Sequence, residues 1–149
     1  MTVNTTLAPA TAAATSIHEQ LEALPDVGYN TEAKARYKSL SMRVLRDLAG
    51  RLGLEAGTYD LRYNRGGIAV SGEATLHGDS IYIQISQSSI NHGHASVLYR
   101  TCDGRQDYRG GRNHFCTPTD MTNIQTLFRM KAMIEAGFDD ADRLRLIVM

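Results

Sequence analysis

The sequence has no tryptophan, only two cysteines and no surplus charge, because 16 basic residues balance 16 acidic ones. Two cysteines are too few for a disulfide-built framework, so we expect free thiols. No apolar run approaches the roughly 18 residues of a membrane-spanning helix, and no signal peptide is recognisable. We therefore expect a soluble, cytoplasmic protein with no membrane partner. The neutral balance also argues against a surface coated in positive charge for general nucleic-acid binding.

Lysine is scarce as well, with three lysines against 13 arginines. This bias favours recognition of anions by the planar guanidinium group, although a high genomic GC content would produce it too. At this length we expect one domain with its own core. Residues 1–30 begin with a Thr- and Ala-rich stretch and are predicted to be a mobile N-terminal segment with a short helix over Ile17 to Leu24. Residues 31–149 are predicted to form the single α+β domain.

Two longer helices are predicted. Apolar residues recur every three to four positions from Thr31 to Leu52, and Gly53 is expected to end this first helix. The second helix is expected to start at Thr117-Pro118-Thr119-Asp120, because Pro suits the first helical position and Thr and Asp are spaced as in a capping box. Gly137 is expected to end it, and a last short helix or strand is expected within residues 139–149.

Between these helices the sequence has the period of strands. Ile81, Ile83 and Ile85 alternate with polar or half-polar residues, and a hairpin turn is predicted at His77-Gly78-Asp79-Ser80. The expected strands cover residues 59–64, 68–71, 73–76, 80–86 and 96–102, after which Asp103-Gly104 is expected to turn the chain back toward Asp107-Tyr108. The predicted fold class is α+β: an antiparallel meander sheet of four to five strands flanked by two main helices.

The stretch from Cys102 to Cys116 carries the strongest functional signal. It combines three arginines, two adjacent glycines, a tyrosine and an Asn-His pair with almost no apolar residue. Guanidinium groups match phosphate or carboxylate, and glycine lets the backbone approach a ligand closely. We interpret it as a loop that binds an anionic ligand, the alternative being an ordered loop shaped by Arg–Asp pairs. The predicted binding residues are Arg105, Asp107, Tyr108, Arg109, Arg112, Asn113 and His114, joined by Arg62, Arg65 and Arg100 if the strands pair as a meander.

Two chemical alternatives rest on single residue types. His92, His94, Cys102, His114 and Cys116 supply the donor types of a zinc site, but their spacing matches no zinc motif, so no metal or other cofactor is predicted. His114 with Asp107 or with a cysteine would suit acid–base or nucleophilic chemistry. No nucleophile, base and oxyanion donor can be assigned together, so the sequence favours a protein that is not an enzyme.

Two blocks, Ile81 to Ser86 and Val97 to Phe115, give the chain a resemblance to known sequences. The second reads Val-Leu-Tyr-Arg-Thr-Cys-Asp-Gly-Arg-Gln-Asp-Tyr-Arg-Gly-Gly-Arg-Asn-His-Phe. Together they resemble small proteins carried by bacteriophages and plasmids, to which no activity is assigned. The resemblance implies a context in which small proteins act on host functions, including immune nucleases and nucleotide signalling, by binding. It transfers no functional residue.

Three hypotheses follow for the function. The first is a non-enzymatic phage or plasmid accessory protein in the cytoplasm of a bacterial host. It would be a host-defence inhibitor, anti-CRISPR or similar, whose arginine-rich loop binds a host protein that handles nucleic acid, a nucleotide or another anionic ligand. The second is a single-stranded nucleic-acid-binding protein, and the third is a small metal- or His-dependent hydrolase or nuclease. Self-association into a homo-oligomer stays open, because the N-terminal segment and the strand at 81–85 need covering. The stacking platforms of the second hypothesis are Tyr63, Tyr82, Tyr99 and Tyr108.

Overall fold

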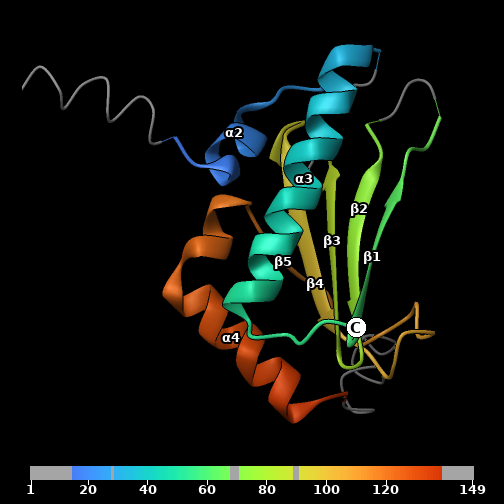
Figure 1. The fold of residues 1–149 in the computed structure, drawn as a ribbon, viewed down its shortest axis with the longest axis vertical. Helices are drawn as coiled ribbons and strands as arrows, with labels where there is room; N and C mark the ends of the chain where they lie inside the picture. Colours follow the sequence, from blue (N-terminus) through green and yellow to red (C-terminus); the bar gives the residue numbers. More distant parts are fainter. Residues whose placement is uncertain (1–14, 28, 68–70, 89–90, 139–149) are drawn as a thin grey trace, which may run out of the picture.

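The computed structural model describes residues 15–27, 29–67, 71–88 and 91–138. A five-stranded antiparallel sheet forms one layer, with its strands in the order β1-β2-β3-β4-β5. The α-helices of the described chain form the second layer, because all of them pack against the same face of this sheet (Figure 1). The predicted α+β meander is therefore confirmed. The strands are β1 (Tyr59–Asn64), β2 (Glu73–Gly78), β3 (Ile81–Gln87), β4 (Ala95–Thr101) and β5 (His114–Cys116).

The helices begin where the sequence places capping residues. Asn30 accepts a hydrogen bond from the backbone N–H of Ala33 at the start of α3, and Ser16 forms a capping box with Glu19 at the start of α2. Leu21 of α2 is fully buried in the core, so this short helix belongs to the domain. The helical elements are α2 (Ile17–Ala23), α3 (Thr31–Arg51), the 3-10 helix η2 (Thr119–Thr122) and α4 (Ile124–Ala136).

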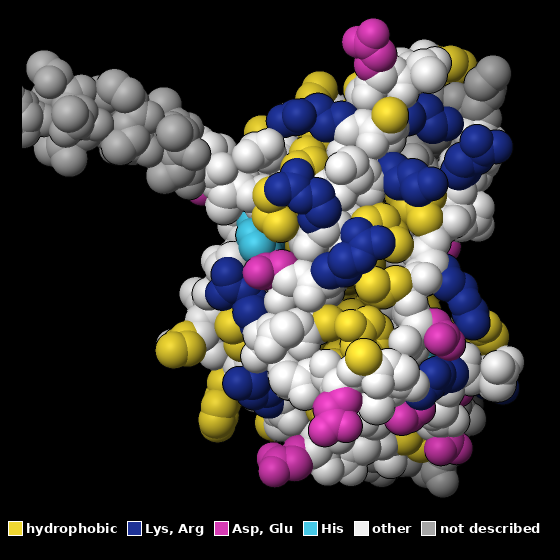
Figure 2. All heavy atoms as spheres, viewed as in Figure 1, with side chains coloured by type: hydrophobic (Ala, Val, Ile, Leu, Met, Phe, Trp, Pro, Cys, Tyr) yellow, Lys and Arg dark blue, Asp and Glu magenta, His cyan; other side chains and the backbone are white. Residues whose placement is uncertain are grey.

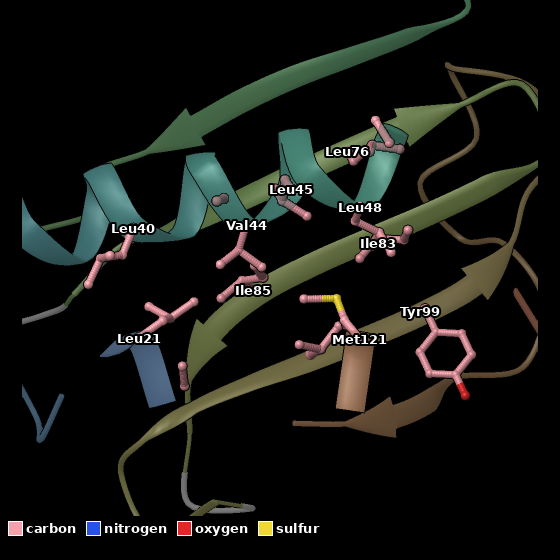
Figure 3. Close-up of a cluster of buried hydrophobic side chains, with 14 of the residues drawn as sticks. Leu21, Leu40, Val44, Leu45, Leu48, Leu76, Ile83, Ile85, Tyr99 and Met121 are labelled. Atoms are coloured by element: carbon pink, nitrogen blue, oxygen red, sulfur yellow. The ribbon is translucent and has the colours of Figure 1, made fainter. Parts of the chain in front are cut away.

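The core lies between the two layers. Side chains from one face of α3, together with Leu21 and Met121, pack against alternate residues of the strands (Figure 3). The strand register aligns Leu76 with Ile83, and Ile83 with Tyr99, so that these residues share the helix-covered face. Burial of such apolar side chains stabilises the fold by about 1.5–3 kcal/mol each.

The opposite face of the sheet, called the open face below, is covered by none of the described helices (Figure 1). Its residues are the other half of the strand alternation, and most of them are polar, as expected for an antiparallel sheet with one face in water. The register aligns them in rows across the sheet. One row is Asp60, His77, Tyr82 and Arg100, and the next is Arg62, Thr75, Gln84, Leu98 and Phe115.

Two predicted boundaries were wrong. The chain returns to the sheet at His114, and not at Asp107-Tyr108, because the Asp107 side chain takes up backbone N–H groups that a strand would use. The predicted helix from Thr117 is split into η2 and α4. Thr117 and Asp120 do form the reciprocal hydrogen bonds of a capping box, but Asn123 is extended and starts a new helix by accepting from Gln125 N.

The structure also tests the predicted hairpin turn, helix end and free thiols. The hairpin turn after Gly78 and the helix end at Gly137 are confirmed. Both cysteines are free. No helix in the described part of the chain is long and apolar enough to cross a bilayer. Residues 1–14, 68–70 and 139–149, and with them the expected strand at 68–71 and the expected C-terminal element, lie outside the described residues.

Candidate functional site: the arginine-rich loop on the open face

The arginine-rich loop, residues 102–113, connects β4 to β5 and folds back over the row that contains His77 and Tyr82. Arg105 anchors it. Its Nε lies 3.0 Å from Oδ1 of Asp79, and its Nη2 donates to the carbonyl oxygen of Gly57 at 2.6 Å. These contacts join the loop to two other turns of the protein. Arg105, predicted to bind a ligand, is thus engaged by the protein itself, as the ordered-loop alternative expected.

Asp107 is a second anchor. Its carboxylate accepts the backbone N–H of Asp103 at 2.9 Å, and those of Arg109 and Gly110 at 3.1 Å each. Hydrogen bonds to an ionised carboxylate are stronger than those between neutral groups. This carboxylate therefore organises the loop backbone.

Arg100 passes directly beneath the loop. Gly110 has φ +59°, and a Cβ at this position would lie 2.6 Å from Nε of Arg100, so only glycine lets the two segments approach this closely. The Arg100 guanidinium lies 4.3 Å from the ring centroid of Tyr82 and donates to the carbonyl oxygen of Tyr108 at 2.8 Å. It also donates to Oδ1 of Asn113 at 3.3 Å. Among the described residues it forms no ion pair with an acid, and the Tyr82 ring gives its charge a cation–π contact.

An aromatic cluster forms the floor of the site. His77 is 2% exposed, and its ring meets those of Tyr82 and Tyr108 edge to face at centroid distances of 5.0 and 5.2 Å. Burial lowers the pKa of His77, although its hydrogen bond to the Gly104 carbonyl opposes this shift, so the ring is neutral at pH 7. Arg62 donates to Oη of Tyr108 at 3.0 Å. The contacts with His77 and Arg62 therefore hold the Tyr108 ring in place, while 57% of the residue stays exposed.

Beside Tyr108 the open face is hollowed. The hollow has a volume of about 380 Å³ and combines aromatic, cationic and hydrogen-bonding side chains. Arg109 and Arg112 are exposed on the loop, and no side-chain hydrogen bond or ion pair engages them within the described residues. The hollow thus places the Tyr108 ring beside the Arg62 cation. The hollow is lined by Arg62, Tyr63, Asn64, Glu73, Thr75, His77, Tyr82 and Tyr108.

The structure separates two of the predicted site residues from this group. His114 lies on the helix-covered face, where its ring stacks on Tyr99 at a centroid distance of 5.3 Å. Asn113, which precedes this strand, is instead bound by Arg100. Arg65 lies beyond the end of β1 and lines a different hollow. Arg100, Tyr108 and Asn113 are joined by the hydrogen bonds that Arg100 donates, and Arg109 and Arg112 are exposed on the same loop.

Sequence reasoning missed His77 as a site residue and assigned it to a hairpin turn. The signal was present in the alternation of β2, because Leu76 is apolar and its neighbour His77 must therefore face the other side of the sheet. Tyr99, predicted as a stacking platform, is fully buried on the helix-covered face and cannot stack on a ligand.

Cys102, Cys116 and three histidines, His92, His94 and His114, supplied the donor types for the two chemical alternatives. Burial raises the pKa of Cys102 to about 11 and that of Cys116 to about 12, so both thiols are protonated at neutral pH and are poor nucleophiles. His94 is bound through Nδ1 to the carbonyl oxygen of Glu22. No group of three or more potential metal ligands occurs among the residues that the structure describes.

Comparisons of the chain with protein-family models, with curated proteins and with solved structures find no match.

Proposed function

We propose that the protein is a non-enzymatic binding protein whose open face takes a nucleotide-like ligand, one that joins a planar ring to an anionic group. The observation that carries this proposal is the exposed Tyr108 ring, fixed beside a hollow, with Arg62 bound to its hydroxyl and Arg100 to its carbonyl oxygen. Ring stacking on tyrosine suits every nucleobase, and guanidinium groups suit phosphate. Glu73, which also lines the hollow, adds an acceptor for the N–H groups of a base.

The distribution of roles within the loop supports binding. Arg105 and Asp107 hold the backbone, so the loop is ordered before a ligand arrives and little ordering entropy is lost on binding. Arg109 and Arg112 keep their donors available. The role of a host-defence inhibitor stays a prediction from the resemblance to phage- and plasmid-borne proteins.

The proposal is tested by calorimetric titration with the four ribonucleoside monophosphates. Wild-type protein is compared with Tyr108→Ala and with the double variant Arg109→Gln/Arg112→Gln. We expect Tyr108→Ala to weaken binding by about ten- to a hundredfold, since stacking contributes about 1–3 kcal/mol per base. The matched controls are Phe128→Ala, which removes an exposed ring from α4, and Arg43→Gln/Arg46→Gln, which removes the same charge from α3.

The outcome is decided by the difference between site and control variants. Unchanged binding by Tyr108→Ala, or equal losses in site and control variants, contradicts the proposal. Wild-type protein that binds none of the four nucleotides at millimolar concentration contradicts it as well.

Single-stranded nucleic acid is a second candidate ligand, favoured by the exposed Phe115 in the row next to Tyr82. A strand could stack one base on Tyr108 and reach this second ring across the same face. Binding of a twelve-residue oligothymidylate should then fall steeply with salt, because phosphate contacts release counterions. Phe115→Ala should weaken this binding and leave binding of a mononucleotide unchanged. Equal effects on both ligands would contradict the strand model.

A further inference from the structure

A second hollow lies on the other side of β1, between the start of α3 and the turn that follows β1. Its volume is about 520 Å³. Figure 2 shows Lys and Arg side chains gathered over this upper part of the helix-covered face. None of the described residues that line the hollow is acidic, in contrast to the open-face site, which includes Glu73. The basic cleft is lined by Tyr29, Thr31, Lys34, Ala35, Lys38, Tyr63, Arg65, Gly66, Gly67 and Ser71.

Three cations converge on this basic cleft from two elements. Lys34 Nζ donates to the carbonyl oxygen of Gly67 at 3.1 Å, which holds the ammonium group at the cleft wall. Lys38 Nζ lies 5.4 Å from the centroid of the Tyr63 ring. Arg65 is exposed and forms no ion pair with any acid of the described chain. Three positive charges without a carboxylate repel one another, and an anion with more than one charge would relieve this repulsion.

Hydrogen bonds and close packing hold the wall of the cleft in place. Tyr63 Oη donates to the carbonyl oxygen of Ser71 at 2.8 Å, which fixes the ring. Gly72, at φ +97°, packs so closely that a Cβ there would lie 2.6 Å from this hydroxyl. The side chain of Asn64 accepts from the backbone N–H of Gly66 at 3.0 Å and fixes the turn that carries Arg65.

We propose that the basic cleft is a phosphate-binding site, independent of the open-face site. Lysine serves as a point charge for phosphate, and arginine adds a planar pair of donors. The phosphate groups can come from a free nucleotide or polyphosphate, or from the backbone of a nucleic-acid strand. Tyr63 lines both hollows, so the two sites are neighbours across β1.

The first test uses pyrophosphate as the probe and the full chain labelled with nitrogen-15. We expect pyrophosphate to shift the amide resonances of Gly66 and Gly67. The double variant Lys38→Gln/Arg65→Gln should weaken its affinity at least tenfold. The control Arg43→Gln/Arg46→Gln removes two charges from the exposed face of the same helix and should change the affinity less than twofold.

Each result decides for or against the cleft. Absent shifts at both glycines, or equal losses in the cleft and control variants, would overturn the proposal. The substituted side chains are exposed, so an unchanged amide spectrum elsewhere verifies that each variant is folded.

A second arm identifies the source of the phosphate. If twelve-residue oligothymidylate displaces pyrophosphate in wild-type protein, the ligand is a nucleic-acid backbone; if only pyrophosphate and nucleoside diphosphates bind, it is a small phosphorylated molecule. Tyr108→Ala should leave pyrophosphate affinity unchanged. Failure of the open-face proposal and failure of the cleft proposal are therefore read from different variants.

Discussion

Replacement of Gly110 by alanine tests how closely the arginine-rich loop is seated on the sheet. Gly110 has φ +59°, and its new Cβ would meet Nε and Cδ of Arg100 at 2.6 and 2.7 Å and the carbonyl oxygen of Thr101 at 2.7 Å. The left-handed conformation costs a residue with a Cβ about 1–2 kcal/mol, and overpacking costs about 1–3 kcal/mol more. We expect Gly110→Ala to lower the free energy of unfolding by about 2–5 kcal/mol.

Gly53→Ala is the matched control. Gly53 also has a positive φ, +71°, but nothing lies within 4 Å of the point that a new Cβ would occupy, so only the conformational cost of about 1–2 kcal/mol applies. Urea unfolding followed by far-ultraviolet circular dichroism gives both values. The difference between the two variants isolates the steric contact, and equal losses would refute the close packing of Gly110 on Arg100.

A double-mutant cycle sharpens this test. Arg100→Ala removes the side-chain atoms that the new Cβ would meet, while the Thr101 carbonyl stays in place. In that background Gly110→Ala should cost less than in the wild type, because contacting residues are energetically coupled. The same cost in both backgrounds would mean that the Arg100 side chain does not lie beneath the loop.

The remaining predictions concern thiols, histidines and the loop anchor. Cys102 and Cys116 should react with Ellman's reagent at pH 8 only after unfolding, because burial raises both pKa values; rapid reaction of the folded protein would contradict this. Burial lowers the pKa of His18 and His77 in the folded protein below 6.5. Both rings are therefore neutral in the folded state above pH 6.5, where their contribution to stability is complete. This contribution is lost as the pH falls from 6.5 through the pKa values of the folded protein. The urea concentration at the unfolding midpoint should therefore drop between pH 7.5 and pH 5, and should drop less in the variant His18→Gln/His77→Gln. Parallel pH profiles of variant and wild type would contradict the assignment of this pH dependence to the two histidines. Arg105→Gln should lower the free energy of unfolding by about 1 kcal/mol, since its ion pair with an exposed acid is partly screened, and should speed amide exchange in the loop. Unchanged exchange would show that Arg105 is not an anchor.

Local patterns predicted most of the fold. The apolar period from Thr31 onward predicted α3 because one helix face is buried from Tyr37 to Ala49. The alternation at Ile81 predicted β3 because alternate residues of that strand face the core. The position of β5 could not be predicted. It depends on three backbone N–H groups accepted by Asp107, and no periodic pattern encodes such a side-chain interaction.

The candidate site was predictable in place but not in detail. The density of Arg and Gly singled out residues 102–116, and Tyr108 and Arg100 do meet there. The role of Arg105 depends on Asp79 and Gly57, which are distant in the sequence. His77 belongs to the site because the register of β2 and β3 pairs it with Tyr82, and the sequence alone does not determine this register.

In the arginine-rich loop, the residues that hold the backbone differ from the residues that are exposed to a ligand. This division affects how the protein can evolve. Arg105, Asp107 and Gly110 carry the contacts that hold the backbone. Arg109 and Arg112 carry no side-chain contact of this kind within the described structure, and substitutions at such exposed positions usually change stability by less than about 0.5 kcal/mol. Ligand preference can thus drift by single mutations at these two positions while the fold is retained. Saturation libraries restricted to them should yield mostly folded proteins, which makes the loop a natural starting point for selecting new binding specificities.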